Sequence, residues 1–283
     1  IIPVVEKAFL KANIQQNEIC AIGFTRGPGL LGSLLVGTSF AKSLAMSLDI
    51  PLIEVNHLQA HILAHFIDDA NPAPPSFPFL CLTVSGGHTM IVLVKDYFDM
   101  EIIGKTIDDA AGEAFDKIGK IFDLDYPAGP IVDRLAKEGN PNAFQFNKPK
   151  MEGYDYSFSG IKTSVLYFIQ KEVRKNPDFI KDNLNDLCAS VQKSIIEILM
   201  DKLEKAAKEL KINDIAIAGG VSANSGLRKA MEDNRERLGW NIFIPKFEYT
   251  TDNAAMIAMV AKLKYERGEF TDIRTTATAK YDL

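Results

Sequence analysis

The chain has 283 residues, of which 47% are hydrophobic and 24% charged, and its formal net charge is −5. This length exceeds one ordinary core, so we expect two lobes. The composition is that of a globular protein, and the negative charge argues against a protein that coats nucleic acid with its whole surface. A local basic patch is compatible with it, although such runs are usually solvated helix faces. The best candidate for such a basic patch is the region around Lys148, Lys150, Lys162, Lys171, Arg174 and Lys175.

No apolar run approaches the roughly 20 residues of a membrane span. The chain does not open on a charged and then apolar leader either, so we expect a cytoplasmic protein. Its three cysteines, Cys20, Cys81 and Cys188, are far apart in sequence. This spacing fits neither a disulfide framework nor a CxxC metal site, and we expect buried thiols.

The start of the chain predicts the order α, β, α, β, α. Residues 1–12 form an amphipathic helix, 18–25 and 51–57 are strands, 30–48 is a helix, and 56–66 is a helix that carries histidines. Two strands are fewer than a sheet normally needs for independent stability. The chain also opens within a helix and without an initiator Met, so we expect that its first few tens of residues are not included.

Two apolar runs, 79–84 and 90–94, flank Ser-Gly-Gly-His-Thr and predict a β-hairpin. A third strand over 101–106 precedes a helix over 110–122, which Asp108 and Asp109 are predicted to cap. After an irregular segment, we expect the remaining elements in chain order. They are helices near 160–175 and 183–210, a strand before the Gly-rich turn at 218–224, a helix, a strand at 241–245 and a helix over 251–268.

The two halves share one order of elements, except that the first lacks the opening hairpin and third strand. Such a duplicated α/β unit is the actin-like ATPase architecture, a ribonuclease H-like fold with a nucleotide cleft between lobes. We place the first lobe at 1–76, completed by 252–283, and the second at 77–251, with a helical insertion at about 125–210. The hairpin loop 85–89 would face phosphate through its Gly-Gly amides, and 218–224 would hold base and ribose.

All four histidines lie between residues 57 and 88. His57 and His61 are four residues apart, so on a helix they share one face and can bind one metal ion. His65 continues this face but cannot reach the same ion without a bend, and His88 lies in the hairpin loop. One HxxxH pair alone is more often a solvated helix surface than a metal site.

Eight strings together point to one family: GPGLLGSLLVG (27–37), NHLQAH (56–61), VSGGHT (84–89), IDDAAGEAFDK (107–117), DYPAGP (125–130), YSFSGIKT (156–163), AGGVSAN (218–224) and TDNAAMIA (251–258). In these strings the chain resembles the bacterial TsaD group of tRNA threonylcarbamoyltransferases, relatives of the archaeal and eukaryotic Kae proteins. The resemblance implies transfer of a threonylcarbamoyl group from its adenylate to N6 of the adenosine 3′ of the anticodon, in tRNAs reading codons that start with A.

The resemblance also implies site residues. His57, His61 and Asp252 would be catalytic and would bind one divalent metal ion, with Fe(II) expected and Zn(II) as the alternative. Two imidazoles and one carboxylate leave positions open for substrate. Without a metal role, Asp252 would be an N-cap. Threonylcarbamoyl-AMP, or ATP or ADP, would be held by Val84, Ser85, Gly86, Gly87, His88, Asp116, Gly129, Asp133 and Asn224.

Asp116 could instead pair with Lys120, and His88 could have a purely structural role in its turn. The chain departs from the family pattern at Gln59, Ala60 and Ala128, where Glu, Gly and Gly are usual. These changes retain both histidine ligands.

The partners that the resemblance implies are tRNA, a TsaB-like paralogue on the first lobe and a TsaE-like ATPase, with neither membrane nor DNA. The helix at 30–48 is rich in small residues, which permits packing against a partner helix. Its pattern alone favours burial inside its own lobe.

Three other functions stay open. A zinc protease of the HExxH type needs a glutamate after the first histidine, where this chain has Leu58. An ATP-dependent phosphotransferase of the same fold would use an aspartate and Mg²⁺. A non-catalytic subunit would bind nucleotide only.

Overall fold

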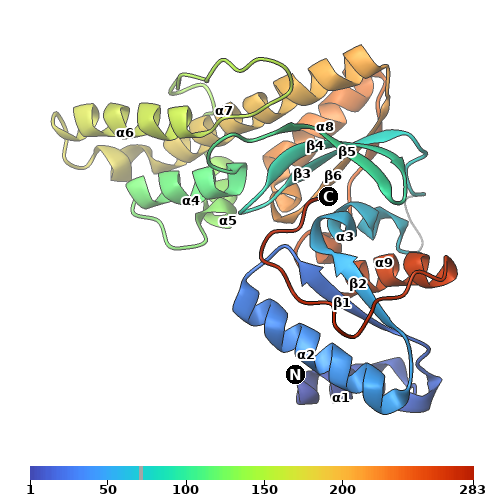
Figure 1. Cartoon of the computed structure of the whole chain (residues 1–283). Coiled ribbons are helices and arrows are strands. Elements are labelled where there is room, and N and C mark those ends of the chain that lie inside the picture. The colour runs from blue at the N-terminus through green and yellow to red at the C-terminus, as the bar shows by residue number, and fades with distance from the viewer. Residues whose placement is uncertain (70–72) are drawn as a thin grey trace. The chain divides into compact units, whose positions relative to one another are not determined.

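Figure 1 shows a computed structural model that describes residues 1–69 and 73–283. The chain forms two compact units, one of Ile1–Asp69 with Asn253–Leu283 and the other within Ala70–Asp252. The C-terminal helix therefore belongs to the same unit as the N-terminal segment.

The first unit contains a parallel pair of strands, β1 (Ile22–Gly27) and β2 (Leu52–Asn56), where the sequence predicted two strands. Its helices are α1 (Ile2–Ala12), α2 (Leu31–Leu48), α3 (His57–Leu63) and α9 (Ala254–Glu266), with 3-10 turns at Gln16–Glu18 and Ala64–Phe66. The predicted order of elements is confirmed for this unit.

The segment after α9 returns to this sheet. The amide N of Thr278 donates to the carbonyl of Arg26 at 2.9 Å. Glu54 accepts from the Arg26 guanidinium at 2.8 Å and from the Tyr281 hydroxyl at 3.1 Å. The Arg26 guanidinium also lies 4.8 Å from the centroid of the Tyr281 ring. These contacts attach the C-terminal residues to both strands.

Helices α1 and α2 carry large apolar side chains on their surfaces. Every residue of α1 has at least partial exposure, and Leu10 is 81% exposed. The sequence pattern favoured burial of α2 in its own lobe, and this expectation is wrong, because its buried residues are Thr38, Ala41 and Ala45.

By length and composition α2 is also apolar enough to cross a membrane, contrary to the expectation that no run approaches that length. A core helix of a soluble protein meets the same criterion, so this property alone assigns no membrane role.

The second unit contains a five-stranded sheet in the order β5-β4-β3-β6-β7. The central strand β3 (Phe79–Val84) runs antiparallel to β4 (Thr89–Asp96) and parallel to β6 (Asp214–Ala218). The outer strands are β5 (Asp99–Lys105) and β7 (Asn241–Phe243). Every residue of β3 is buried, as expected for a central strand that is apolar except for Thr83. The predicted hairpin and third strand are confirmed.

Among the described residues of this unit, five helices accompany the sheet: α4 (Ala111–Ile121), α5 (Ala128–Ala136), α6 (Ser159–Val173), α7 (Phe179–Leu210) and α8 (Ser225–Leu238). Part of the segment expected to be irregular forms α5. Helix α7 begins before the predicted residue 183. Non-helical backbone angles at Asn183 (φ −122°, ψ 16°) separate the first turn of α7 from the rest of the helix. The side-chain amide of Asn183 donates to the carbonyl of Phe179 at 2.8 Å.

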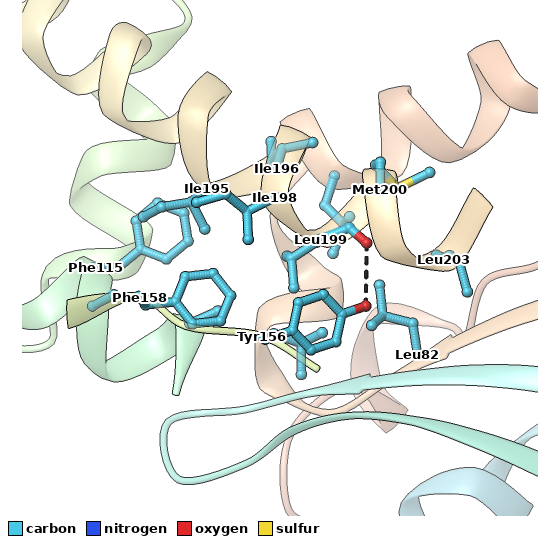
Figure 2. Packing of buried hydrophobic residues seen from close by; sticks show 14 of the residues in the cluster. Leu82, Phe115, Tyr156, Phe158, Ile195, Ile196, Ile198, Leu199, Met200 and Leu203 are labelled. Atoms are coloured by element: carbon cyan, nitrogen blue, oxygen red, sulfur yellow. Dashed lines mark hydrogen bonds between the residues drawn. The ribbon is translucent and has the colours of Figure 1, made fainter. Parts of the chain in front are cut away.

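The core of the second unit lies beneath α7 (Figure 2). Tyr156 is fully buried among aliphatic and aromatic side chains, and its hydroxyl donates to the carbonyl of Leu199 at 3.2 Å. Burial raises the pKa of this phenol well above its ordinary value. Tyr156 and its neighbour Phe158 thereby attach the chain before α6 to the core.

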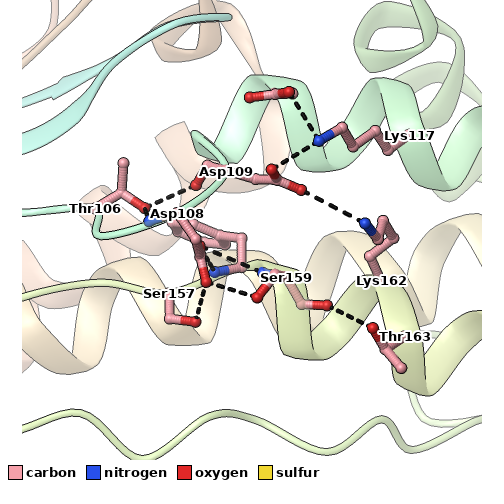
Figure 3. A network of polar contacts seen from close by, with 10 residues as sticks. Thr106, Asp108, Asp109, Lys117, Ser157, Ser159, Lys162 and Thr163 are labelled. Atoms are coloured by element: carbon pink, nitrogen blue, oxygen red, sulfur yellow. Dashed lines mark hydrogen bonds and ion pairs between the residues drawn. The ribbon is translucent and has the colours of Figure 1, made fainter.

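The predicted capping of α4 by Asp108 and Asp109 is wrong. The amide N of Ala111, the first residue of α4, donates to the Thr89 hydroxyl at 2.9 Å. Asp109 instead forms an ion pair of 2.7 Å with Lys117. This ion pair is part of the polar network in Figure 3.

Asp108 joins the chain before α4 to the start of α6. Its carboxylate accepts from the hydroxyls of Ser157 and Ser159, both at 2.6 Å, and from the amide N of Phe158 at 2.8 Å. Burial raises the pKa of this carboxyl, but these hydrogen bonds outweigh burial, and the pKa lies below its ordinary value.

We predict that Asp108→Asn destabilises the protein by about 1 kcal/mol near neutral pH, because the neutral amide accepts fewer and weaker hydrogen bonds. A carboxyl whose pKa is lowered by folding stabilises above its unfolded pKa and loses that contribution as the pH falls through its folded pKa. The difference between the two proteins should therefore shrink at about pH 3. Urea unfolding at both pH values measures it, with Asp233→Asn on the exposed surface of α8 as the control. An equal loss at both pH values would contradict this role.

Candidate functional site

Asn56 positions the two histidines at the start of α3. Its side-chain oxygen accepts from the amide N of Leu58 at 2.8 Å and of Gln59 at 3.3 Å, so Asn56 is the N-cap. His57 is therefore the first residue of the helix, and His61 follows one turn later. His61 is 5% exposed, and its ring centroid lies 4.7 Å from that of His57.

Asp252 lies directly before α9 but does not cap it. Asn253 is the N-cap, because its side-chain oxygen accepts from the amide N of Met256 at 2.8 Å. The alternative in which Asp252 caps this helix is therefore wrong. The Asp252 side chain is exposed.

Among the residues that the structure describes, one group can share a metal ion, and it consists of His57, His61 and Asp252. One ligand atom from each lies within 4.8 Å of the others. Metal–ligand bonds of about 2.1 Å place two donors at most about 4.2 Å apart, so small side-chain adjustments would complete the site.

His65 does not extend the histidine face. Helix α3 ends at Leu63, and His65 lies in the following 3-10 turn, Ala64–Phe66. The predicted continuation of the helix to residue 66 is wrong.

The departures from the family pattern are accommodated in the structure. Ala60 is fully buried beside the ligands in α3. Ala128 is 2% exposed at the start of α5, and a Cβ placed on Gly119 would lie 2.2 Å from its methyl group. The extra methyl at Ala128 therefore requires glycine at position 119.

The hairpin loop between β3 and β4 is closed by its own serine. The amide N of Ser85 donates to the carbonyl of His88 at 2.8 Å, and the Ser85 hydroxyl accepts from the amides of Gly87 at 3.3 Å and His88 at 3.0 Å. The Gly87 amide, one of the two in the predicted Gly-Gly anion site, thus already donates to a side chain within the loop. A Cβ on Gly86 or Gly87 would meet nothing within 4 Å, so the space before both glycines is open.

Helix α4 begins against this loop. The amide N of Gly112 donates to the carbonyl of Ser85 at 3.2 Å. A Cβ on Gly112 would lie 2.6 Å from that oxygen and 2.8 Å from the Cα of Gly86. Glycine at 112 therefore permits the helix N-terminus, which favours anions, to lie beside the open loop.

A pocket of about 400 Å³ lies in the second unit next to this loop, within the size range of small-molecule sites. Its lining includes five of the residues predicted to hold the adenylate: Gly86, Asp116, Gly129, Asp133 and Asn224. The other predicted residues are outside the lining: Val84, Ser85, Gly87 and His88. Val84 is fully buried in β3, and the other three shape the loop.

Three further lining residues, Gly220, Val221 and Ala223, belong to the turn 218–224 that the sequence predicted to hold base and ribose. The remaining lining residues were not predicted from the sequence: Gly112, Phe115, Tyr126, Pro127, Pro130 and Phe247. Tyr126 and Phe247 are 84% and 72% exposed. Tyr126 lies in a family string, whereas no string contains Phe247.

Both pocket carboxylates also hold helix ends. Oδ1 of Asp116 accepts from the amide N of Ala128 at 2.8 Å, so this side chain turns toward α5 and not toward Lys120. Oδ1 of Asp133 accepts from the amide and hydroxyl of Ser225, at 3.0 and 2.7 Å. The pocket is thereby built around the first turns of α5 and α8.

Two of the solved structures with a similar fold are HypF proteins. Full-length HypF in its phosphate- and nucleotide-bound form superposes with a TM-score of 0.67 at 14% identity, over 95% of this chain and 42% of that protein. HypF of T. kodakarensis has a TM-score of 0.62 at 17% identity, over 93% of this chain and 43% of that protein. The predicted actin-like ATPase fold class is confirmed.

Curated relatives match along almost the whole chain. Proteins named tRNA N6-adenosine threonylcarbamoyltransferase are 83% identical in Riemerella anatipestifer, over all of this chain and 83% of the relative, and 60% identical in Christiangramia forsetii, over 99% and 83%. Residues 1–259 match the TsaD family model, described as tRNA N6-adenosine threonylcarbamoyltransferase. The chain therefore belongs to the TsaD family, as its eight strings predicted.

Proposed function

We propose that this enzyme transfers the threonylcarbamoyl group from threonylcarbamoyl-adenylate to N6 of the adenosine 3′ of the anticodon, in tRNAs that read codons starting with A. The observation that carries the proposal is the group of His57, His61 and Asp252, with ligand atoms within 4.8 Å of one another, in a chain of the TsaD family. The product of such a transfer is a tRNA with a modified adenosine.

The metal ligands in this proposal are His57, His61 and Asp252. Two imidazoles and one carboxylate suit Fe(II), which we propose first, and also Zn(II). When bound, the ion supplies Lewis-acid polarisation of the acyl oxygen. The buried ring of His61 and the capped start of α3 hold two of these donors in place before binding.

The adenylate-binding residues in this proposal lie around the 400 Å³ pocket. Asp116 and Asp133 each use Oδ1 within the protein, so their Oδ2 atoms would accept from ribose hydroxyls. Asn224 would recognise the nucleoside through its amide, and Gly129 gives close approach. The open loop at Gly86, shaped by Ser85, Gly87 and His88 after Val84, would face phosphate.

An exocyclic amine of adenine is a weak nucleophile, so positioning should contribute much of the acceleration. The proposed adenylate pocket would hold the leaving AMP through several hydrogen-bonding side chains. An ion held by His57, His61 and Asp252 would polarise the reacting acyl group. No side chain is assigned as a general base.

The partners that we propose are tRNA, a TsaB-like paralogue and a TsaE-like ATPase, in the cytoplasm, with neither membrane nor DNA. The exposed apolar residues of α1 and α2 support a protein partner on the first unit. The basic patch supports tRNA binding less well, because Lys148 pairs with Glu197 and Lys175 with Glu172.

The experiment that tests this function incubates the purified protein with labelled threonylcarbamoyl-adenylate and unmodified tRNA, with and without both partners. We expect label in the tRNA and release of AMP. Nucleotide binding without label transfer would indicate a non-catalytic subunit. ATP turnover without tRNA and without label transfer would indicate a phosphotransferase.

We predict that His61→Ala abolishes both metal retention and transfer, because the remaining two donors hold an ion weakly. Elemental analysis after dialysis and the labelled transfer assay measure the two effects. Full transfer by wild-type protein stripped of metal would contradict the proposed role of the ion.

Asp252 and Asn253 provide a matched pair of changes at adjacent positions. Asp252→Asn should lower metal affinity at least about tenfold with little change in stability, because it replaces a ligand but leaves the cap. Asn253→Ala should cost about 1 kcal/mol of stability and retain the metal, because it removes the cap. Competitive metal titration and urea unfolding of both variants test this. Equal metal affinity in the two variants would refute the assignment of Asp252.

A further inference from the structure

We propose that Gln192, a residue of α7 outside the eight family strings, is a positioning residue that orients the side-chain amide of Asn224 for the nucleoside. The inference rests on the proposed adenylate site, because Asn224 lines that pocket. Gln192 does not line it and would act only through Asn224.

Two hydrogen bonds fix the amide of Asn224. Its Oδ1 accepts from the amide N of Leu227 at 3.0 Å and caps α8. Its Nδ2 donates to Oε1 of Gln192 at 2.7 Å, and both side chains are 8% exposed. A primary amide has two N–H donors. After these two contacts, one N–H of Asn224 is left for a ligand.

The two contacts also exclude the flipped amide. A half-turn of the Asn224 amide would place its oxygen against the oxygen of Gln192 and its NH₂ group against the N–H of Leu227. One acceptor would then face another acceptor, and one donor another donor, at buried positions, which is unfavourable. Gln192 therefore adds a second constraint to that of the helix cap.

Gln192 is itself confined by its surroundings. A Cβ on Gly226 would lie 2.7 Å from Nε2 of Gln192 and 2.8 Å from Cδ1 of Ile196. Glycine at 226 thus allows the Gln192 amide to lie against the first turn of α8. On α7, the Ser190 hydroxyl accepts from the amide N of Phe144 at 3.2 Å, which attaches this part of the helix to a second segment.

The expected consequence is a change in nucleotide binding with little change in chemistry. An amide that recognises the nucleoside interacts equally with the bound substrate and the transition state, so its loss raises KM and leaves kcat nearly unchanged. A loss of general stability would not produce this separation.

The test is a double-mutant cycle in the full chain, with the ADP dissociation constant measured by calorimetry. Gln192→Met keeps the side-chain length and removes the acceptor, and Asn224→Ala removes the oriented amide. Each should weaken ADP binding about tenfold, and the double variant should bind no more weakly than Asn224→Ala alone. The control is Gln170→Met, the same exchange at an exposed position of α6.

The outcomes distinguish failure of the proposed adenylate site from failure of the role proposed for Gln192. If wild-type protein does not bind ADP, the proposed adenylate site and this inference both fail. If Asn224→Ala weakens binding and a folded Gln192→Met does not, the inference alone fails. It also fails if the two effects multiply in the double variant, because Gln192 would then act independently of Asn224.

A second measurement uses the unaltered protein in case Gln192→Met does not fold. The Asn224 side-chain amide gives NMR signals that are identified by their loss in Asn224→Ala. We expect one of its protons to exchange slowly with solvent, because Gln192 accepts it at a buried position. Rapid exchange of both protons would overturn the inference.

Discussion

Two asparagine caps determine where the proposed metal ligands lie. Asn56 ends β2 and fixes the first residue of α3 as His57, and Asn253 fixes the start of α9 directly after Asp252. Helices α3 and α9 pack against each other in the first unit. The ligands therefore meet because two helices begin at defined residues, although almost 200 residues separate them in the chain.

The first of these caps is also attached to the end of the chain. The side-chain amide of Asn56 donates to the carbonyl of Asp282 at 2.7 Å, while its oxygen caps α3. Lys264 on α9 donates to the backbone carbonyl of Glu54 at 3.0 Å, and burial lowers the pKa of this lysine. Contacts between distant parts of the chain thus hold β2, α3 and α9 in one arrangement.

In the second unit, too, single polar side chains have two roles. Asp116, Asp133 and Asn224 each accept hydrogen bonds at the start of a helix and also line the pocket. The three residues that fix the helix starts around the pocket are therefore also proposed to bind the adenylate. A change at any of them is expected to alter local structure and binding together, which is why a neighbouring residue such as Gln192 separates the two effects better.

Local patterns predicted much of this structure. Two apolar runs on either side of Ser-Gly-Gly-His-Thr predicted the hairpin of β3 and β4, and the eight strings predicted the family. What local patterns missed depends on distant contacts. Asp108 resembles a helix cap in sequence, but Ser157 and Ser159, about 50 residues later, take its carboxylate. Phe247 lines the pocket without any local signal, because only the folded chain brings it there.

The most direct test of the metal centre is a crystal structure of the metal-loaded protein with data collected at the absorption edge of the bound ion. We predict one anomalous peak within about 2.3 Å of a ring nitrogen of His57, a ring nitrogen of His61 and a carboxylate oxygen of Asp252. A peak coordinated by other residues, with Asp252 outside bonding distance, would contradict it.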